Sequence, residues 1–265
     1  MSRKVPTSTA GSKKAATMIY PEYFARFYDL IYHRVRDGVD NTFYLDRVRK
    51  TTGKVLEVGV GTGRLFVEAL TNGADIYGID ISPAMIGIVT GKLDSNQKKR
   101  ISRQNIIDFI LPHKFSLILA PFRVFMHLTT KKEQLNALNN VYDHLSPGGE
   151  FIFDAFIPDL NLLLNGTSNV TDFDEEFEPG NRVKRTVTSR PDLLNQVLNI
   201  TFTMEWNEGG KIFRKDWNTI MRYFFRFELE HLVERSEFRK YKILGDFEGN
   251  ELDQSSREFI VVCKK

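Results

Sequence analysis

Apolar runs of strand length alternate with stretches of helical spacing between residues 54 and 154. Strands are expected at residues 55–58, 76–79 and 115–120 and, after a turn at residues 145–149, at residues 150–154. Strands that alternate with helices predict a parallel sheet with helices on both faces. Ligands of such sheets bind beyond the carboxyl ends of the strands, so the functional site is expected there.

The pattern changes after residue 157. Apolar and polar residues alternate along residues 200–206, which predicts a half-buried strand. The turn Asn207-Glu208-Gly209-Gly210 then reverses the chain into residues 212–220, and residues 183–189 supply a third strand. We therefore expect residues 158–222 to form an antiparallel insertion.

Three glycines follow the first strand at alternate positions, Gly59, Gly61 and Gly63. They permit a tight turn and leave no side chains between the backbone and a nucleotide-like ligand at the start of the next helix. The second strand ends at Asp80, where a carboxylate can accept both hydroxyls of a ribose. The dinucleotide fingerprint needs a further glycine where this chain has Arg64, which argues against a nicotinamide dehydrogenase. The chain is expected to bind an adenosine cofactor.

Five ordered segments resemble the motifs of the class I S-adenosylmethionine-dependent methyltransferases. They are Glu57-x-Gly59-x-Gly61-x-Gly63, Ile79-Asp80-Ile81-Ser82-Pro83, Gln104-Asn105-Ile106-Ile107-Asp108-Phe109, Phe115-Ser116-Leu117-Ile118-Leu119-Ala120 and Leu145-Ser146-Pro147-Gly148-Gly149. The resemblance covers residues 20–156 and resumes at residues 223–265. It implies an α/β fold with a Rossmann-like, seven-stranded, mostly parallel sheet whose last strand is antiparallel. In this reading residues 18–157 and 223–265 are the methyltransferase core, and residues 158–222 are an inserted β lid over the active site, a stabilising extension or a dimerisation surface.

The resemblance also implies S-adenosylmethionine as the cofactor. The residues expected to hold it are Tyr28, Glu57, Gly59, Gly61, Gly63, Arg64, Asp80, Ile81, Asn105, Ile106 and Ala120. Glu57 would order the glycine loop, and Asn105, in place of the usual aspartate, would accept a hydrogen bond from the adenine amino group. Tyr28 either lies over the methionine end, where an aromatic face accommodates a sulfonium cation, or is an ordinary core aromatic.

Two residues beyond the fourth strand are the catalytic candidates. His127, in Phe125-Met126-His127-Leu128, resembles the Phe-x-His-Leu segment of bacterial small-molecule methyltransferases, including sugar-amine N,N-dimethyltransferases. It is either the base that removes a proton from the acceptor or a structural hydrogen-bonding residue. Arg123 either anchors an anionic group of the substrate or pairs with a carboxylate of the lid. The acceptor is expected to be a small molecule that is methylated on N or O.

Composition narrows these expectations. A chain of 265 residues with 42% hydrophobic residues can form one large core and an appendage. The 37 basic and 34 acidic side chains are too balanced to favour nucleic acid as a partner. No apolar run approaches the roughly 18 residues of a membrane span, and no Cys/His cluster has metal-ligand spacing. The single cysteine, Cys263, suits a reducing cytoplasm.

Three questions stay open from the sequence. Residues 1–17 form either a disordered basic tail or an RNA-binding arm. Homodimerisation is one of the expected oligomeric states. The alternative function is an adenosine-cofactor-binding module that acts through a partner without catalysing transfer.

Overall fold

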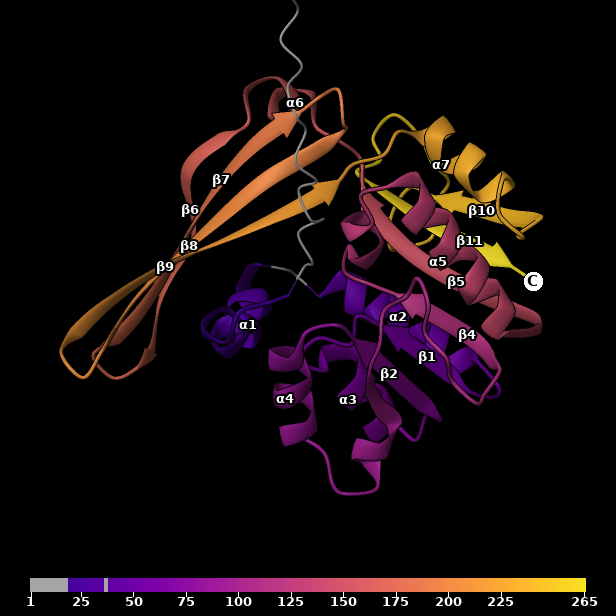
Figure 1. Ribbon diagram of the computed structural model, residues 1–265, viewed down its shortest axis with the longest axis horizontal. Coiled ribbons are helices and arrows are strands. Elements are labelled where there is room, and N and C mark those ends of the chain that lie inside the picture. The colour runs from indigo at the N-terminus through magenta and orange to yellow at the C-terminus, as the bar shows by residue number, and fades with distance from the viewer. Residues whose placement is uncertain (1–18, 36–37) are drawn as a thin grey trace, which may run out of the picture.

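The computed structural model describes residues 19–35 and 38–265 (Figure 1). The expected tail at residues 1–17 lies outside the described residues. The described chain forms a seven-stranded sheet in the order β10-β11-β5-β4-β1-β2-β3 and a separate four-stranded sheet in the order β6-β7-β8-β9. We call them the core sheet and the insertion sheet.

The core sheet has the expected mixed arrangement. Its parallel strands are β1 (Val55–Val58), β2 (Ile76–Asp80), β3 (Ile101–Arg103), β4 (Phe115–Ala120) and β5 (Leu145–Phe156). The final pair is β10 (Lys240–Leu244) and β11 (Glu258–Lys264), and β11 runs antiparallel to both β10 and β5. All four residues of β1 are buried, as expected for a central strand that helices cover on both faces. The predicted fold class is confirmed.

Helices cover both faces of the core sheet. The helices α2 (Val39–Lys50), α3 (Arg64–Thr71) and α4 (Pro83–Gly91) pack on one face, and α5 (Lys131–His144) and α7 (Arg226–Glu234) pack on the other (Figure 1). Short 3₁₀ helices occur at Gln97–Arg100 (η1) and Val124–His127 (η2). Ser82 caps α4 by accepting the backbone N–H of Met85, and Pro83 occupies the first turn. This cap fixes the start of α4 just after the carboxyl end of β2, where the loops of the site lie.

The insertion sheet consists of four antiparallel strands of similar length. They are β6 (Thr167–Glu178), β7 (Asn181–Asp192), β8 (Val197–Glu208) and β9 (Lys211–Arg222), and the short helix α6 (Leu160–Asn165) precedes them. Three of these strands were expected from the sequence, whereas β6 was not. Phe173 is the one buried residue of β6, because this edge strand is largely acidic and exposed. Its sequence therefore lacks the apolar alternation on which the expectation of the other strands rested.

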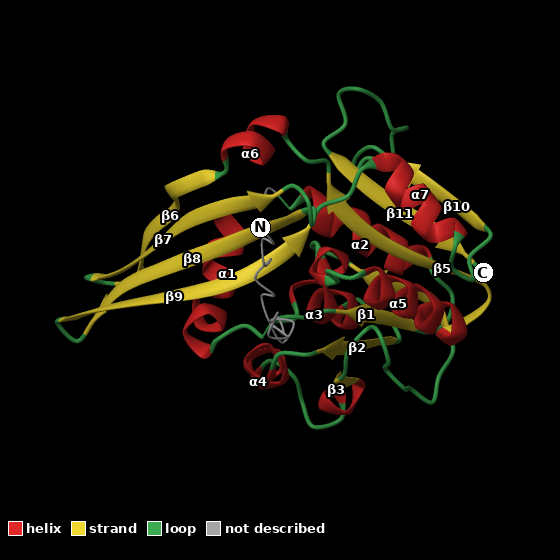
Figure 2. Ribbon diagram, turned by 45° about the horizontal axis from the view of Figure 1, so that its top comes forward, coloured by secondary structure: helices red, strands yellow, loops and turns green. Residues whose placement is uncertain are grey.

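Helix α1 (Glu22–Val35) joins the two sheets, and Figures 1 and 2 both place it between the insertion sheet and α4. Its buried face packs on the insertion sheet, where Phe24 and Phe27 contact Trp217 and Trp206. On the core side, Asp29 accepts hydrogen bonds from the hydroxyl of Thr62 and, at 2.6 Å, from Nζ of Lys92. The α1 helix thus links the glycine loop to the insertion sheet. Within the described part of the chain, no helix is long and apolar enough to cross a membrane.

Candidate active site

A cavity of about 280 Å³ opens at the carboxyl ends of the parallel strands, between the loops after β1, β2, β3 and β4. Eight residues expected at the cofactor line this cavity: Tyr28, Gly59, Gly61, Arg64, Asp80, Ile81, Asn105 and Ile106. Glu57, Gly63 and Ala120, which were also expected at the cofactor, lie outside the lining, in the strands and the helix start that support it. We call this space the cofactor cavity.

The glycine loop has the backbone that its sequence predicts. Gly59 has a φ of +73°, and a Cβ there would lie 2.4 Å from Cγ2 of Val124. Gly61 has a φ of +55°, and a Cβ there would lie 3.9 Å from the backbone oxygen of Gly59, which is an ordinary contact. The backbone conformation and the approach of η2 therefore both require glycine at position 59. At Gly63 a Cβ would lie 2.5 Å from Cγ2 of Val89, so this residue permits close packing of α3 on α4.

Asp80 ties the glycine loop to the end of β2. Its Oδ2 accepts the backbone N–H of Gly61 at 2.9 Å, and its Oδ1 accepts that of Ser82 at 2.8 Å. Burial raises the pKa of Asp80, and these backbone hydrogen bonds oppose that rise. Because Asp80 also lines the cavity, its remaining lone pairs can accept the hydroxyls of a ribose.

Glu57 is a buried carboxyl group with an unsatisfied oxygen. Its exposure is 1%, and no described residue donates a hydrogen bond to its Oε2. Burial raises the pKa of Glu57 well above its usual range, while the positive charge of Arg64 opposes this shift. An orphaned buried acceptor is costly. Glu57 therefore keeps one unsatisfied acceptor oxygen in β1, outside the lining of the cofactor cavity.

Asn105 and Tyr28 both line the cofactor cavity. The Oδ1 of Asn105 accepts the N–H of Ile107 at 3.3 Å and keeps a second lone pair for an adenine amino group. The ring of Tyr28 lies 4.3 Å from that of Tyr32 and 5.7 Å from that of Tyr20, between centroids. Tyr28 is therefore both part of the aromatic packing around α1 and part of the cavity wall.

A second cavity, of about 320 Å³, lies between α1, the insertion sheet and the turn after β4. It shares five lining residues with the cofactor cavity: Tyr20, Tyr28, Arg64, Phe122 and His127. The rest of its lining is Tyr32, Arg123, Phe156, Phe202, Trp217, Thr219 and Met221. We call it the acceptor cavity, because its walls meet those of the cofactor cavity at the catalytic candidate His127.

His127 ends η2 and lines both cavities. Its Nδ1 lies 3.4 Å from the backbone oxygen of Ile220 on β9, which assigns the proton to Nδ1 and leaves a lone pair on Nε2. Burial lowers the pKa of His127 to about 4. The imidazole is therefore neutral at pH 7, and Nε2 keeps its lone pair.

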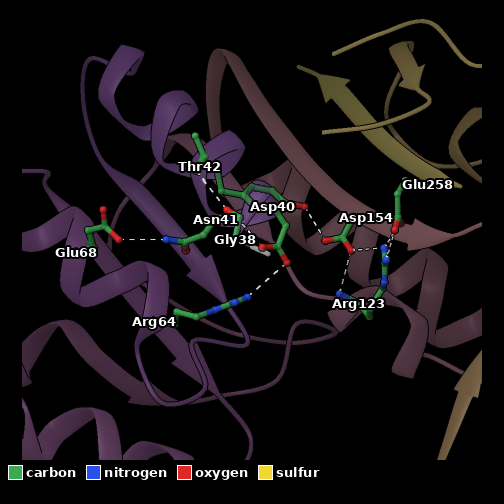
Figure 3. A network of polar contacts seen from close by, with 10 residues as sticks. Gly38, Asp40, Asn41, Thr42, Arg64, Glu68, Arg123, Asp154 and Glu258 are labelled. Atoms are coloured by element: carbon green, nitrogen blue, oxygen red, sulfur yellow. Dashed lines mark hydrogen bonds and ion pairs between the residues drawn. The ribbon is translucent and has the colours of Figure 1, made fainter. Parts of the chain in front are cut away.

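Arg123 lines the acceptor cavity but not the cofactor cavity. It forms ion pairs with Asp154 at 2.7 Å and with Glu258 (Figure 3). Both carboxylates belong to strands of the core sheet, so the expected pairing with a carboxylate of the lid is not what the structure shows. Two carboxylates already engage the guanidinium that was expected to anchor a substrate anion.

Several residues that the fold brings into the lining were not expected from the sequence, among them Tyr20, Phe122 and Thr219. The guanidinium carbon of Arg64 lies 3.9 Å from the centroid of the Phe122 ring. The Oγ1 of Thr219 is buried and has no hydrogen-bond partner among the described residues. One signal was present in the sequence: Trp217, Thr219 and Met221 occupy alternate positions of one strand and hence one face of the insertion sheet.

Comparisons with known proteins agree with this architecture. A methyltransferase domain family matches residues 56–151. A curated relative, the putative methyltransferase YqeM of Bacillus subtilis, is 22% identical over 249 residues, which are 94% of this chain and 98% of that protein. Among the described residues, no cluster of His, Cys, Asp and Glu could hold a metal ion.

Solved structures share the fold. The sugar N-methyltransferase KedS8 from Streptoalloteichus aligns with a TM-score of 0.73 at 18% identity, over 94% of this chain and 98% of its own. CalS10 of Micromonospora echinaspora, an amino pentose methyltransferase whose structure contains S-adenosylmethionine, aligns with a TM-score of 0.65 at 17% identity, over 94% of this chain and 99% of its own. At these identities the likeness establishes the fold.

Proposed function

Since this chain is a class I S-adenosylmethionine-dependent methyltransferase, we propose that it transfers the methyl group to a nitrogen or oxygen atom of a small-molecule acceptor. The observation that carries the proposal is the pair of adjoining cavities with His127 in the wall of both. One cavity has the polar groups that a nucleoside needs, and the other is largely aromatic. An acceptor in the second cavity would lie beside the cofactor in the first.

The residues of the cofactor cavity fit S-adenosylmethionine. Asp80 would accept the ribose hydroxyls and Asn105 the adenine amino group, and Glu57 would order the glycine loop from outside the lining. Bound S-adenosylmethionine supplies an electrophilic methyl group. Tyr20 and Tyr28 form an aromatic wall that favours a cation without forming an ion pair with it.

The chain contributes orientation, exclusion of water and a proton acceptor. The acceptor cavity is closed by α1 on one side and by β8 and β9 on another, and this enclosure orients the acceptor atom toward the cofactor cavity. Nε2 of His127 would take the proton that the acceptor loses. Arg64, stacked on Phe122, lies in the wall of both cavities.

The charges around the acceptor cavity favour a particular protonation state. Among the described residues that line it, none is an aspartate or a glutamate, and its two arginines, Arg64 and Arg123, are paired with carboxylates outside the lining. An ammonium group would find no partner of opposite charge in this lining. An amine acceptor would therefore bind as the free base, which is the form that attacks a methyl group. The names of KedS8 and CalS10 support an amine on a sugar as one such acceptor.

Three further proposals concern the location of the protein, its partners and the role of the insertion sheet. The buried single thiol of Cys263 supports a reducing, cytoplasmic location. The balanced charge supports small molecules over nucleic acid as partners. The insertion sheet, which provides Phe202, Trp217 and Thr219 to the acceptor cavity, supports the assignment of residues 158–222 as a lid.

Calorimetry and mass spectrometry test the proposed function. The folded protein is expected to bind S-adenosylmethionine and its demethylated product S-adenosylhomocysteine, and to methylate members of a panel of amino sugars and hydroxylated ring compounds. Absence of heat with either cofactor form would refute the assignment of the cavity. Cofactor binding without methylation of any acceptor would instead favour a binding module that acts through a partner.

A further inference from the structure

The turn between β4 and η2 holds two consecutive residues in the left-handed backbone region, Phe122 with φ 58° and Arg123 with φ 72°. Side chains other than glycine rarely adopt this region, and such strain persists only where the surroundings impose it. The turn leads directly into η2, whose last residue is His127. The position of His127 therefore depends on whatever holds this turn.

A buried carboxylate holds the turn. Asp154, at the end of β5, has an exposure of 0%. Its Oδ2 accepts the backbone N–H of Arg123 at 3.2 Å and Nη1 of Arg123 at 2.7 Å (Figure 3). Its Oδ1 accepts the hydroxyl of Tyr44, on α2, at 2.7 Å. Asp154 thus connects α2, β5 and the strained turn.

A second carboxylate completes the arrangement from another strand. Glu258 of β11 accepts hydrogen bonds from both Nη1 and Nη2 of Arg123. Such paired contacts fix the orientation of a guanidinium as well as its position. Both the backbone and the side chain of Arg123 are therefore held by the core sheet.

We propose that Tyr44 and Asp154 are positioning residues that set the orientation of His127 toward the acceptor, although neither lines the cofactor cavity or the acceptor cavity. This inference rests on the proposed role of His127 as the proton acceptor. Among the described residues, the ring of His127 is held by one polar contact, from Nδ1 to the backbone oxygen of Ile220 at 3.4 Å, which is long for a hydrogen bond. The turn that precedes η2 consequently determines where Nε2 lies, and a small displacement there reduces the rate of an oriented reaction strongly.

The most direct test is Tyr44→Phe, which removes one hydroxyl and keeps the ring in its buried place. We expect kcat to fall about tenfold, with the KM of the acceptor and the Kd of S-adenosylmethionine changing less than about twofold. We also expect the ring resonances of His127, assigned by NMR with His127→Gln, to shift. The matched control is Tyr241→Phe, because Tyr241 also donates to a carboxylate, Glu234 at 2.9 Å, but on the surface. The control is expected to change none of these quantities.

A folded Tyr44→Phe variant with wild-type kcat, or with unshifted His127 resonances, would overturn the proposal. Should that variant fail to fold, Glu258→Gln tests the same turn from β11, where the side chain is 20% exposed, and the same expectations apply. The NMR comparison needs no acceptor. A wild-type protein that methylates nothing would therefore refute the proposed function, whereas the resonances of His127 would still decide whether Tyr44 and Asp154 position it.

Discussion

At the scale of single residues, Asp80 has two roles, because it orders the glycine loop through Gly61 and also lines the cofactor cavity. Asp80→Asn replaces one acceptor oxygen by a donor that opposes either the N–H of Gly61 or a ribose hydroxyl. We expect the affinity for S-adenosylmethionine to fall at least tenfold, which is about 1.4 kcal/mol. Calorimetry measures the change.

The control for this substitution is Asp75→Asn at the other end of β2. Asp75 is 2.7 Å from Nζ of Lys54 and belongs to an ion pair far from the glycine loop. The control is expected to bind the cofactor as the wild type does. Equal affinities of the Asp80→Asn variant and the wild type would contradict the assignment of the ribose site.

A second prediction is that the protonation of His127 makes the stability of the protein depend on pH. Its pKa is about 4 in the folded protein, against about 6.5 in an unfolded chain. As the pH falls, His127 is protonated in the unfolded chain at a higher pH than in the folded protein. The stability that His127 contributes is therefore complete above about pH 6.5 and is lost as the pH falls toward 4. The loss amounts to up to about 3 kcal/mol.

Urea unfolding between pH 4 and 7.5 measures this effect. His127→Gln should flatten the dependence on pH, whereas His231→Gln, on the exposed face of α7, should retain it. If both variants follow the wild-type curve, the imidazole of His127 is not held in its neutral form by burial.

Sequence reasoning at this scale succeeded where the partners are close in the chain and failed where they are distant. Glu57, Gly59, Gly61 and Asp80 lie within two successive strand ends, and local spacing was enough to group them. Arg123 pairs with Glu258, which is 135 residues away, and the fold alone brings these side chains together. Thr219 reaches the acceptor cavity for the same reason, because β9 crosses back over η2.

At the scale of elements, Gly63 is the N-cap of α3 and Gly73 follows the end of this helix, and these two glycines allow a controlled comparison. Both have positive φ values, +87° and +85°. A Cβ at Gly73 would meet nothing within 4 Å, whereas a Cβ at Gly63 would lie 2.5 Å from Val89. Gly73→Ala should cost about 1 kcal/mol of stability through its backbone conformation. Gly63→Ala should cost at least about 1 kcal/mol more, because α4 must shift.

Thermal or urea denaturation of the two variants measures the difference. Adding Val89→Ala to the Gly63→Ala variant should restore part of the difference, since it removes the atoms that clash. Equal losses in the two single variants would show that close packing between α3 and α4 does not require glycine at position 63.

The elements of the core sheet could be predicted because their apolar periodicity is local and strong. The strand β4 was expected at the residues where it occurs. The edge strand β6 was missed, since an exposed acidic strand carries no apolar alternation and is identified only by its pairing with β7. Its charged residues also make that edge a poor partner for another strand of like charge.

At the scale of the whole molecule, the two tryptophans report on one contact. Trp206 and Trp217, the two tryptophans of the sequence, both lie in the cluster between α1 and the insertion sheet. Tryptophan fluorescence therefore follows this contact, while far-UV circular dichroism follows mainly the helices of the core. We expect fluorescence to change at lower urea concentration than circular dichroism, because the insertion sheet is separate from the core sheet.

Saturating S-adenosylmethionine should bring the two midpoints closer. Tyr20 and Tyr28 line the cofactor cavity, and Asp29 binds the glycine loop through Thr62. A bound cofactor therefore stabilises the state in which α1 is packed against the core. Coincident midpoints without cofactor would show instead that the two sheets unfold as one unit. An Asp29→Asn variant should reduce the effect of the cofactor on the fluorescence midpoint.

The order of strands in the core sheet has a consequence for synthesis on the ribosome. β5 borders β11, and between them in the chain come the whole insertion sheet and α7. The hairpins of β6–β9 can therefore form while β5 still has an unpaired edge in the growing polypeptide. Arg123 receives its second carboxylate only when Glu258 has left the exit tunnel, 135 residues later. A chaperone that shields hydrophobic edges would then act during this interval, when the nascent chain already has its insertion sheet but Arg123 still lacks Glu258.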